Sequence, residues 1–343
     1  MTTSVCIIGS GFGMYCLLPA FANIKNCNVV SICGKNSQRM EQVFKKFSLQ
    51  RYDNWKDMLQ KEKPDAVAIA VIPYYQYEIA KFALEHNIAV FAEKPLTTSH
   101  KTSFDLYNLA IEKKIPNMID FLFPEIPEWV KAKEIIENGK IGKISNVNVI
   151  WNFLSYDLKN NVKSWKTDAK QGGGALSFFF SHGLYYLEYF LGEIKNLQCN
   201  FSSSELSLNK AESKLDMIIN FQNGCQGNIH VDISNSENTK HLLEFHGSDG
   251  KLILQNLSHN VVDNFELILN ISDKLEKIPT NDHSLTYNDT LEDSRVKIVS
   301  SLAKKFIKWC ETGIAQKPDF QNGLRVQEMI DAAINSNQSF SIR

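Results

Sequence analysis

The sequence lacks the features that mark several classes of protein. Its seven cysteines, spread over 343 residues, are odd in number and form no Cys-x-x-Cys pair. This pattern fits neither a disulfide framework nor a cysteine-based zinc site. We therefore expect no metal and a reducing compartment, the cytoplasm.

Long apolar runs and a secretory leader are also missing. The longest purely apolar run, residues 66–72, is far too short to cross a bilayer. The first basic residue is Lys25, and glycines interrupt the apolar start, which does not fit a signal peptide. We expect no membrane partner.

No charge of one sign is in excess. There are 37 Lys and Arg against 38 Asp and Glu, giving a formal net charge of −1. Proteins that bind nucleic acid need a clustered basic excess to neutralise phosphates. The expected partner is therefore a small molecule and not a nucleic acid. At this length, with 43% hydrophobic residues, the chain can form two domains with full cores.

The first third of the chain alternates short β-branched runs with helical patterns. The predicted strands are 5–8, 28–33, 66–71, 89–92 and 117–121, and the predicted helices are 14–23, 37–47, 75–85 and 99–113. Such alternation is typical of βαβ units around a parallel sheet. We predict an α/β fold class, with a doubly wound Rossmann domain over residues 1–122.

The pattern changes after a helix predicted over 127–138, which Gly139 ends. The strands predicted after it are 145–153, 197–203, 214–222, 225–233, 240–247 and 251–254, with a type I′ turn at Asn223-Gly224. Helices return at 293–312 and 324–336. Successive strands without helices between them indicate an α+β domain over 123–343, with a large open, mainly antiparallel sheet. An open sheet must bury its uncovered face, so a homodimer or homotetramer is expected.

A glycine-rich loop lies between the first strand and the first helix. Gly9, Gly11 and Gly13 follow four apolar residues, in the context that a phosphate-binding loop requires. Met14 stands where G-x-G-x-x-G would have its third glycine, so the loop alone also fits a simple strand-to-helix turn.

The end of the second predicted strand bears on the choice of cofactor. Dinucleotide-binding folds that prefer NAD(H) carry an acid there for the ribose 2′-hydroxyl. Here the sequence is Cys33-Gly34-Lys35-Asn36-Ser37, with a cation and no acid. Lys35 suits a 2′-phosphate and favours NADP(H) over NAD(H). The alternative is that Lys35 is only a solvated loop residue.

Two segments carry candidate catalytic side chains. Lys94, in Glu93-Lys94-Pro95, ends the fourth predicted strand, and ligands of open α/β sheets bind beyond such ends. Its amine can stabilise an oxygen that becomes alkoxide-like. His182 follows Trp165 and three glycines at 172–174, within an apolar helical pattern. A histidine in that setting is either a catalyst or a satisfied core residue.

Taken together, these segments resemble the Gfo/Idh/MocA oxidoreductase family. The resemblance rests on motifs in matching order, namely the glycine loop, Pro73-Tyr74-Tyr75-Gln76, Glu93-Lys94-Pro95, Ile141-Gly142-Lys143-Ile144, Trp165 with the glycine triplet and His182, Gly247-Ser248-Asp249-Gly250, and Gly323-Leu324-Arg325-Val326-Gln327. It implies hydride transfer between NAD(P) and a carbon of a sugar, cyclitol, sugar nucleotide or similar compound. It also implies that the open sheet forms a subunit interface.

The resemblance implies a role for each matching residue. Lys94 would bind the reacting oxygen, and His182 would act as acid or base. The expected cofactor-binding residues are Gly9, Gly11, Phe12, Gly13, Lys35, Ile72, Pro73, Gln76, Glu93 and Lys94. The expected substrate residues are Asp120, Trp165, Asp168, Phe178 and Tyr186.

The chain departs from the family pattern just before the histidine. Phe178 and Phe180 stand where members often have an aspartate and a glycine. A phenylalanine cannot orient an imidazole, so Asp120, Asp168, Tyr185 or Tyr186 would have to do so, or the phenylalanines line an apolar pocket.

The same departure leaves two other functions open. One alternative is a catalytically inactive nucleotide-binding regulator or scaffold of the same fold, as in the yeast galactose repressors. A Schiff-base enzyme that uses Lys94 would leave the glycine loop unexplained.

Overall fold

The computed structural model describes residues 2–35, 38–47, 49–235, 237–280 and 293–338. The chain forms two compact units, of which the first comprises Met1–Leu122 and Leu285–Gln327 and the second Phe123–Ser284 and Glu328–Arg343. The sequence predicts a second domain that runs from residue 123 to the end. In the structure, residues 293–327 belong to the first unit instead, because the helix in this segment packs its apolar side on the first sheet.

The first unit contains a six-stranded sheet in which every pair of neighbouring strands is parallel. The strand order is β3-β2-β1-β4-β5-β6. The strands are β1 (Thr3–Ile8), β2 (Cys27–Cys33), β3 (Gln50–Tyr52), β4 (Ala66–Ile69), β5 (Ala89–Ala92) and β6 (Asn117–Ile119). This order confirms the predicted Rossmann topology. The sequence did not predict β3, a three-residue edge strand without a buried residue.

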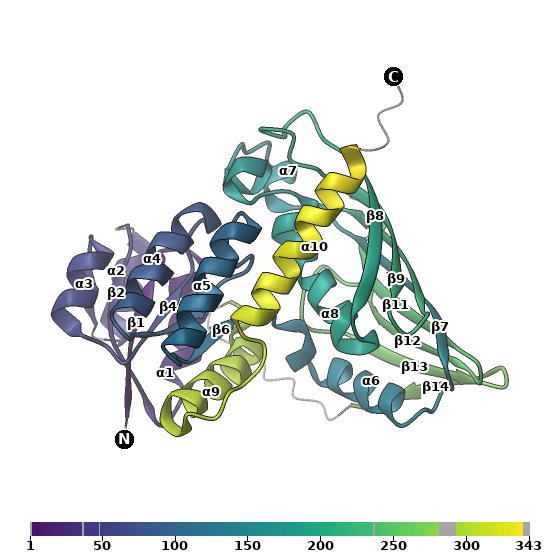
Figure 1. Ribbon diagram of the computed structural model, residues 1–343, viewed down its shortest axis with the longest axis horizontal. Coiled ribbons are helices and arrows are strands. Elements are labelled where there is room, and N and C mark those ends of the chain that lie inside the picture. Colours follow the sequence, from purple (N-terminus) through teal and green to yellow (C-terminus); the bar gives the residue numbers. More distant parts are fainter. Residues whose placement is uncertain (1, 36–37, 48, 236, 281–292, 339–343) are drawn as a thin grey trace. The chain divides into compact units, whose positions relative to one another are not determined.

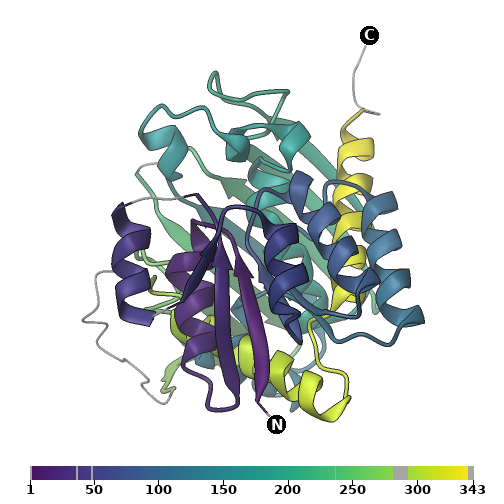
Figure 2. The same ribbon diagram turned by 90° about the vertical axis from the view of Figure 1, so that its left-hand side faces the viewer.

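Helices cover both faces of this sheet (Figure 2). They are η1 (Gly13–Leu17), α1 (Leu18–Ala22), α2 (Gln38–Phe47), α3 (Trp55–Glu62), α4 (Pro73–Glu85), α5 (His100–Glu112) and α9 (Val296–Thr312). Phe91 of β5 meets Phe21 of α1 and Phe306 of α9 with ring centroids 5.3 and 5.8 Å apart. This aromatic contact joins α1 and α9 on one face. The predicted start of α2 at Ser37 lies outside the described residues.

The second unit is built on an eight-stranded sheet (Figure 1). Its strand order is β14-β13-β12-β11-β7-β10-β9-β8. The strands are β7 (Ile144–Asn152), β8 (Ile194–Ser202), β9 (Lys214–Phe221), β10 (Gln226–Asp232), β11 (Lys240–Gly247), β12 (Lys251–Asn256), β13 (Glu266–Ile271) and β14 (Lys274–Ile278). Only β7 and β10 pair in parallel, so the predicted mainly antiparallel sheet is confirmed. The sequence analysis missed β13 and β14.

The second unit also contains helical segments, some of which pack against the sheet. They are η2 (Phe123–Glu125), α6 (Pro127–Glu137), α7 (Tyr156–Lys159), η3 (Trp165–Thr167), η4 (Ala169–Gln171), η5 (Ala175–Phe180) and α8 (Ser181–Leu191). A further helix, α10 (Phe320–Gln338), begins in the first unit and ends in the second. Along β7, Val147, Val149 and Trp151 are buried beneath the helices, whereas Asn148 and Ile150 face the other side and are half-buried.

Two predicted turns have different outcomes. Gly139 has φ +66° directly after α6, which confirms it as the helix stop. At Asn223-Gly224 only the glycine has a positive φ, +88°, so the predicted type I′ turn is wrong. Asn223 instead uses its side chain to accept a hydrogen bond from Cys225 N, in a three-residue loop that Gly224 closes.

Candidate active site

The glycine loop after β1 has a geometry that only glycine allows at its first position. Gly9 has φ +135°, and a Cβ built on it would lie 2.2 Å from the Ala70 carbonyl oxygen. Its N–H donates to the Cys33 carbonyl oxygen at 2.9 Å, so the loop is fixed between β2 and β4. Gly9 therefore brings the chain into a tight turn at the carboxyl edge of the sheet.

The rest of the loop leaves room for a diphosphate. Gly11 is exposed, and a Cβ built on it meets nothing within 4 Å. Gly13 begins the helical turn η1, and the N–H groups of Met14 and Tyr15 donate to the Gly11 carbonyl oxygen at 2.9 and 3.1 Å, which fixes the start of this turn. These residues fit the pyrophosphate of a dinucleotide. Met14, in place of the third glycine, is buried in the core.

An arginine that the sequence analysis missed lies beside this loop. The Arg295 guanidinium sits 4.5 Å from the centre of the Phe12 ring. Its Nε and one terminal nitrogen each donate to Asp293 at 2.7 Å, which makes a bidentate ion pair. No local sequence motif links residue 295 to residue 12, because the contact arises only when α9 returns to the first sheet.

Lys35, the residue predicted to favour NADP(H), lies just after β2. Lys35 is exposed two residues after β2 ends at Cys33. The structure adds the neighbouring strand β3, where Arg51 donates to the Asp53 carboxylate at 2.6 Å. An exposed lysine after β2 and an arginine–aspartate pair at β3 thus lie on neighbouring strands.

Gln76 holds the turn that contains Lys94. This fully buried side chain lies in the first turn of α4, and its amide nitrogen is 2.6 Å from the Glu93 carbonyl oxygen. The same nitrogen is 3.1 Å from the carbonyl oxygen of Pro95 and 3.0 Å from that of Leu96. Gln76 thus contacts the Glu93-Lys94-Pro95 backbone directly. Of the other predicted residues here, Pro73 is the first residue of α4 and Ile72 precedes it.

Two acidic residues directly follow two neighbouring strands, and one of them precedes Lys94 in the sequence. Glu93 follows β5 and Asp120 follows β6, and their carboxyl groups are hydrogen-bonded to each other. Burial raises the pKa of Glu93, and burial together with the Glu93 carboxylate raises the pKa of Asp120 well above its usual range. Asp120 is a predicted substrate residue, and in the structure it belongs to this pair.

His182 lies in the second unit, on the first turn of α8, and is buried. The edge of its ring meets the Phe123 ring, with centroids 5.1 Å apart and planes at 89°. Gly183 follows it, and a Cβ on Gly183 would be 2.1 Å from the Phe180 ring. The start of α8 therefore depends on close packing of Phe180 on glycine.

The glycine triplet allows the chain to pass under two other segments. A Cβ on Gly173 would be 2.3 Å from the Trp165 carbonyl oxygen, and one on Gly174 would be 2.4 Å from the Glu212 carboxylate. Glu212, which the sequence analysis missed, accepts from Leu176 N at 2.6 Å. It thus caps the helical segment that leads to His182, and burial raises its pKa to about 7.

The structure brings Trp165 and Phe178 together. Their ring centroids are 4.9 Å apart at 76°, and the Lys166 ammonium lies 5.5 Å from the centre of the Phe178 ring. Both side chains are half-buried, whereas Phe180 is fully buried. Of the three phenylalanines, Phe180 therefore belongs to the core and does not line a pocket.

Two other predicted substrate residues bond within the second unit. The Asp168 carboxylate accepts hydrogen bonds from the Asn209 side chain at 2.6 Å and the Gln171 side chain at 2.8 Å. Tyr186 is fully buried, and its hydroxyl lies 3.1 Å from His241 Nε2. Burial lowers the pKa of His241 to about 3, so the imidazole that shares this hydrogen bond is neutral.

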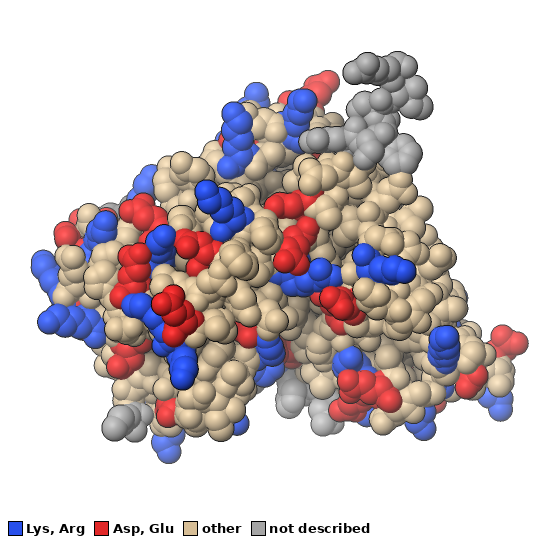
Figure 3. Space-filling model, in the orientation of Figure 1, with Lys and Arg blue, Asp and Glu red and all other residues tan. Residues whose placement is uncertain are grey.

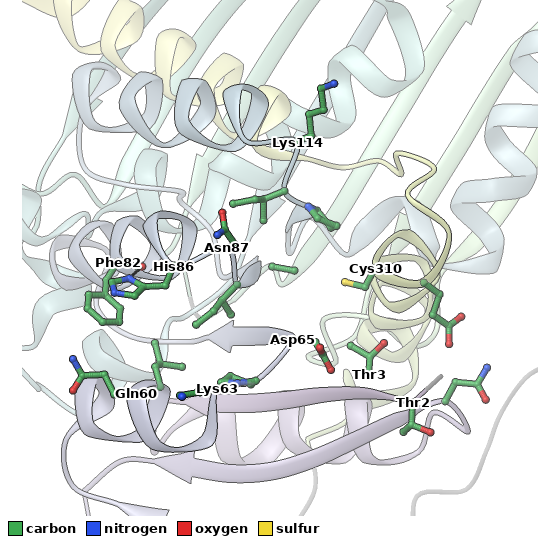
Figure 4. A pocket seen from close by; sticks show the side chains of 18 residues that line it. Thr2, Thr3, Gln60, Lys63, Asp65, Phe82, His86, Asn87, Lys114 and Cys310 are labelled. Carbon is green, nitrogen blue, oxygen red and sulfur yellow. Dashed lines mark hydrogen bonds between the residues drawn. The ribbon is translucent and has the colours of Figure 1, made fainter.

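The first unit also has a cavity of about 1300 Å³ (Figure 4). It is lined by Thr3 at the start of β1, Asp65 before β4 and Ala89 at the start of β5. These are the amino ends of the strands, the edge opposite the glycine loop. The cavity is therefore separate from the dinucleotide site. Within the described residues, no cluster of three metal-ligating side chains is present and no helix is long and apolar enough to cross a membrane.

The fold and the loop define a dinucleotide-binding oxidoreductase. Residues 3–121 match the model of the oxidoreductase family with an NAD-binding Rossmann fold, and residues 133–341 match that family's C-terminal alpha/beta domain. The chain belongs to the Gfo/Idh/MocA oxidoreductase family. It is an NAD(P)-dependent oxidoreductase.

Similar proteins support this assignment. The uncharacterized oxidoreductase sll0816 of Synechocystis sp. is 25% identical, covering 98% of this chain and 94% of that protein. An inositol 2-dehydrogenase/D-chiro-inositol 3-dehydrogenase of Lactiplantibacillus plantarum is 28% identical over 149 residues, 41% of each chain. A solved structure of levoglucosan dehydrogenase, in complex with NADH and L-sorbose, has a TM-score of 0.86 at 20% identity and covers 99% of this chain and 98% of that one. This last likeness is one of fold.

Proposed function

We propose that this protein is an NADP(H)-preferring oxidoreductase that moves hydride between the nicotinamide ring and a carbon of a sugar, a cyclitol, a sugar nucleotide or a related compound. The observation that carries this proposal is that a glycine loop after β1 and an anchored lysine after β5 both lie at the carboxyl edge of the same parallel sheet. Relatives named for levoglucosan and inositol support a polyhydroxylated substrate.

Each proposed role follows from the chemistry of the side chain. Gly9, Gly11 and Gly13 hold the diphosphate, and the bound nicotinamide ring supplies or accepts the hydride. Lys94 donates a hydrogen bond to the substrate oxygen and stabilises its developing negative charge. His182 gives a proton to that oxygen or takes one from it. Trp165 and Phe178 offer an apolar surface for a sugar ring.

The direct test follows the oxidation of NADPH in the presence of ketosugars, ketocyclitols and keto sugar nucleotides. We expect turnover with at least one compound and about 10²–10⁴-fold less turnover for His182→Ala, with cofactor affinity retained. A matched control is His230→Ala, because this exposed histidine lies on β10 of the same unit. Unchanged turnover of His182→Ala would assign His182 to the core.

The preference for NADP(H) rests on Lys35 and on the lack of an acid between Cys33 and Lys35. A lysine ammonium attracts the 2′-phosphate that a carboxylate would repel. We expect Lys35→Asp to raise the KM for NADPH and to leave the KM for NADH little changed. Equal effects on both cofactors would contradict the preference.

A nucleotide-binding regulator or scaffold remains the second candidate, because phenylalanines stand at 178 and 180. It predicts that NADPH binds, measured by its fluorescence, and that no compound in the panel causes oxidation. Lys94 and His182 favour the enzyme, since a binding module needs no proton donor.

We also propose that the outer face of the eight-stranded sheet forms a homodimer or homotetramer interface. This face carries half-buried apolar side chains, among them Ile150, Leu242 and Ile253, and Ile218 is 54% exposed. A sheet face of this kind gains stability when a second copy covers it. Sedimentation at micromolar concentration tests it, and a monomeric mass would contradict it.

The cytoplasm is the proposed compartment. All seven cysteines are free thiols, and burial raises the pKa of several of them, including Cys6 to about 12. On the face shown in Figure 3, basic and acidic side chains are interspersed. Fractionation of the cells that express the protein tests this assignment, and recovery outside the cytoplasm would contradict it.

A further inference from the structure

The acid pair formed by Glu93 and Asp120 has a position that the parallel sheet imposes. The Glu93 N–H donates to the Ile69 carbonyl oxygen and the Asp120 N–H to the Ala92 carbonyl oxygen, both at 2.9 Å. The backbone of each acid thus extends the hydrogen-bonded pairing of the parallel strands by one residue beyond the end of its strand. Two side chains that leave neighbouring parallel strands at the same level lie side by side, and here both are carboxyl groups.

Few hydrogen-bond donors reach the oxygens of the two carboxyl groups. Within the described residues, no group other than the partner acid donates a hydrogen bond to Glu93 Oε1 or to either Asp120 oxygen, although all three atoms are buried. The backbone N–H of Lys94 donates to the Glu93 carboxylate. Two carboxyl groups can bond to each other only if one of them is protonated. The pair therefore holds one proton between its two carboxyl groups.

The charged groups around the pair come from three elements. Lys94 lies on the turn after β5, Arg295 and its partner Asp293 lie at the start of α9, and Cys16 lies in η1. The two cations stabilise one negative charge on the pair. A second negative charge in the same buried space is costly unless another positive charge arrives.

A bound dinucleotide brings such a charge. The strand order places β1, with the phosphate loop, between β2 and β4. The adenosine half of the dinucleotide lies over the β2 side in this topology, so the nicotinamide half lies over β4, β5 and β6. The oxidised nicotinamide ring carries a positive charge, and the reduced ring is neutral.

We propose that Glu93 and Asp120 form a proton store that responds to the redox state of the cofactor. Binding of the oxidised cofactor releases the shared proton to solvent and leaves two carboxylates, whereas binding of the reduced cofactor leaves the proton in place. Asp120 and Glu93 act through the charge of the ring, so they are positioning residues. This inference rests on the cofactor binding in the proposed function and not on the substrate.

The test is calorimetry of cofactor binding in buffers with different ionisation enthalpies, near neutral pH. With NADP⁺ we expect release of about one proton per site, and with NADPH close to none. The affinity for NADP⁺, and not that for NADPH, should rise up to about tenfold per pH unit while the pair holds its proton. NAD⁺ and NADH serve as a second pair of probes.

Substitutions at Glu93 and Asp120 test whether the released proton comes from this pair. The asparagine of Asp120→Asn can still donate a hydrogen bond to Glu93 but has no proton to release. The difference in proton release between binding of NADP⁺ and binding of NADPH should therefore disappear. Glu93→Gln should have the same effect. Asp65→Asn is the matched control, because this acid lies at the opposite edge of the same sheet, hydrogen-bonded to Ser4, and should behave as the wild type.

The possible results separate this inference from the proposed function. Equal proton release with oxidised and reduced cofactor in the wild type would overturn the proton store alone. Proton release that persists in Asp120→Asn and Glu93→Gln would also overturn it. If neither form of either cofactor binds, the proposed cofactor site is wrong and the inference falls with it.

Discussion

The side-chain amide of Gln76 donates to the main-chain carbonyl of Glu93 across 2.6 Å. Gln76 lies in the first turn of α4, the helix that follows β4, whereas Glu93 follows β5. The contact therefore joins the ends of two neighbouring strands, and Lys94 is the next residue along the chain. The backbone position of the proposed catalytic lysine depends on a residue 18 positions earlier in the sequence.

Replacing this amide should impair both folding and turnover. In Gln76→Leu the buried carbonyl groups of the Lys94 turn lose their donor, which should cost about 1–3 kcal/mol of unfolding free energy. A displaced Lys94 should lower kcat more than it changes the KM for cofactor. Denaturant unfolding and steady-state kinetics measure both effects. Glu78→Gln, on the exposed side of the same helix, is the control, and an unchanged kcat in Gln76→Leu would contradict the role.

Two glycines of the phosphate loop should respond differently to alanine. Gly9→Ala forces a Cβ against the Ala70 carbonyl at a positive φ, so the folded protein should lose stability. Gly11→Ala meets no protein atom within 4 Å, so stability should stay near the wild-type value. The new methyl group would occupy the space of the diphosphate, and we expect about tenfold weaker NADPH binding or more. Thermal unfolding and cofactor fluorescence titration distinguish the two. Tight binding by Gly11→Ala would place the diphosphate elsewhere.

Tyr186 offers a test between a core and a substrate role. Tyr186→Phe removes the hydroxyl that is hydrogen-bonded to His241 Nε2 and leaves this buried nitrogen of a neutral imidazole without that bond. We expect a loss of about 1–3 kcal/mol of unfolding free energy. Tyr189→Phe, a half-buried neighbour on α8, is the control. If Tyr186→Phe instead keeps its stability and raises the KM for substrate, the hydroxyl contacts substrate.

Glu212 should make stability depend on pH. Because burial raises its pKa in the folded state to about 7, the folded protein keeps a proton that the unfolded chain has already released. Stability is therefore lost as pH rises from the ordinary carboxyl range towards 7, by at most about 1.4 kcal/mol per pH unit. Unfolding of Glu212→Gln across this range should lack this contribution. Glu205→Gln, exposed on the same loop, is the control, and equal pH slopes for Glu212→Gln and the wild type would contradict the assignment.

Local patterns were enough to predict most elements. The predicted range 89–92 coincides with β5, and α6 was predicted within one residue at each end. Such segments combine a clear apolar periodicity with glycine, proline or N-cap residues at their ends. Ser99 is an example, since its hydroxyl accepts from Thr102 N at the start of α5. The strands β3, β13 and β14 were missed. The strands β3 and β14 are exposed edge strands with little apolar alternation, and the inner strand β13 has one buried residue, Leu267.

The position of the nucleotide loop and of Lys94 follows from the chain alone, since both lie directly after strands and their motifs are local. The partners of these residues do not, because Arg295, Asp120 and Glu212 reach Phe12, Glu93 and Leu176 only through folding. Periodicity reports what is close in sequence, whereas the pKa of a buried acid depends on which distant groups packing brings to it. The tertiary structure alone decided that Glu93 and Asp120 form a pair and that Phe180 belongs to the core.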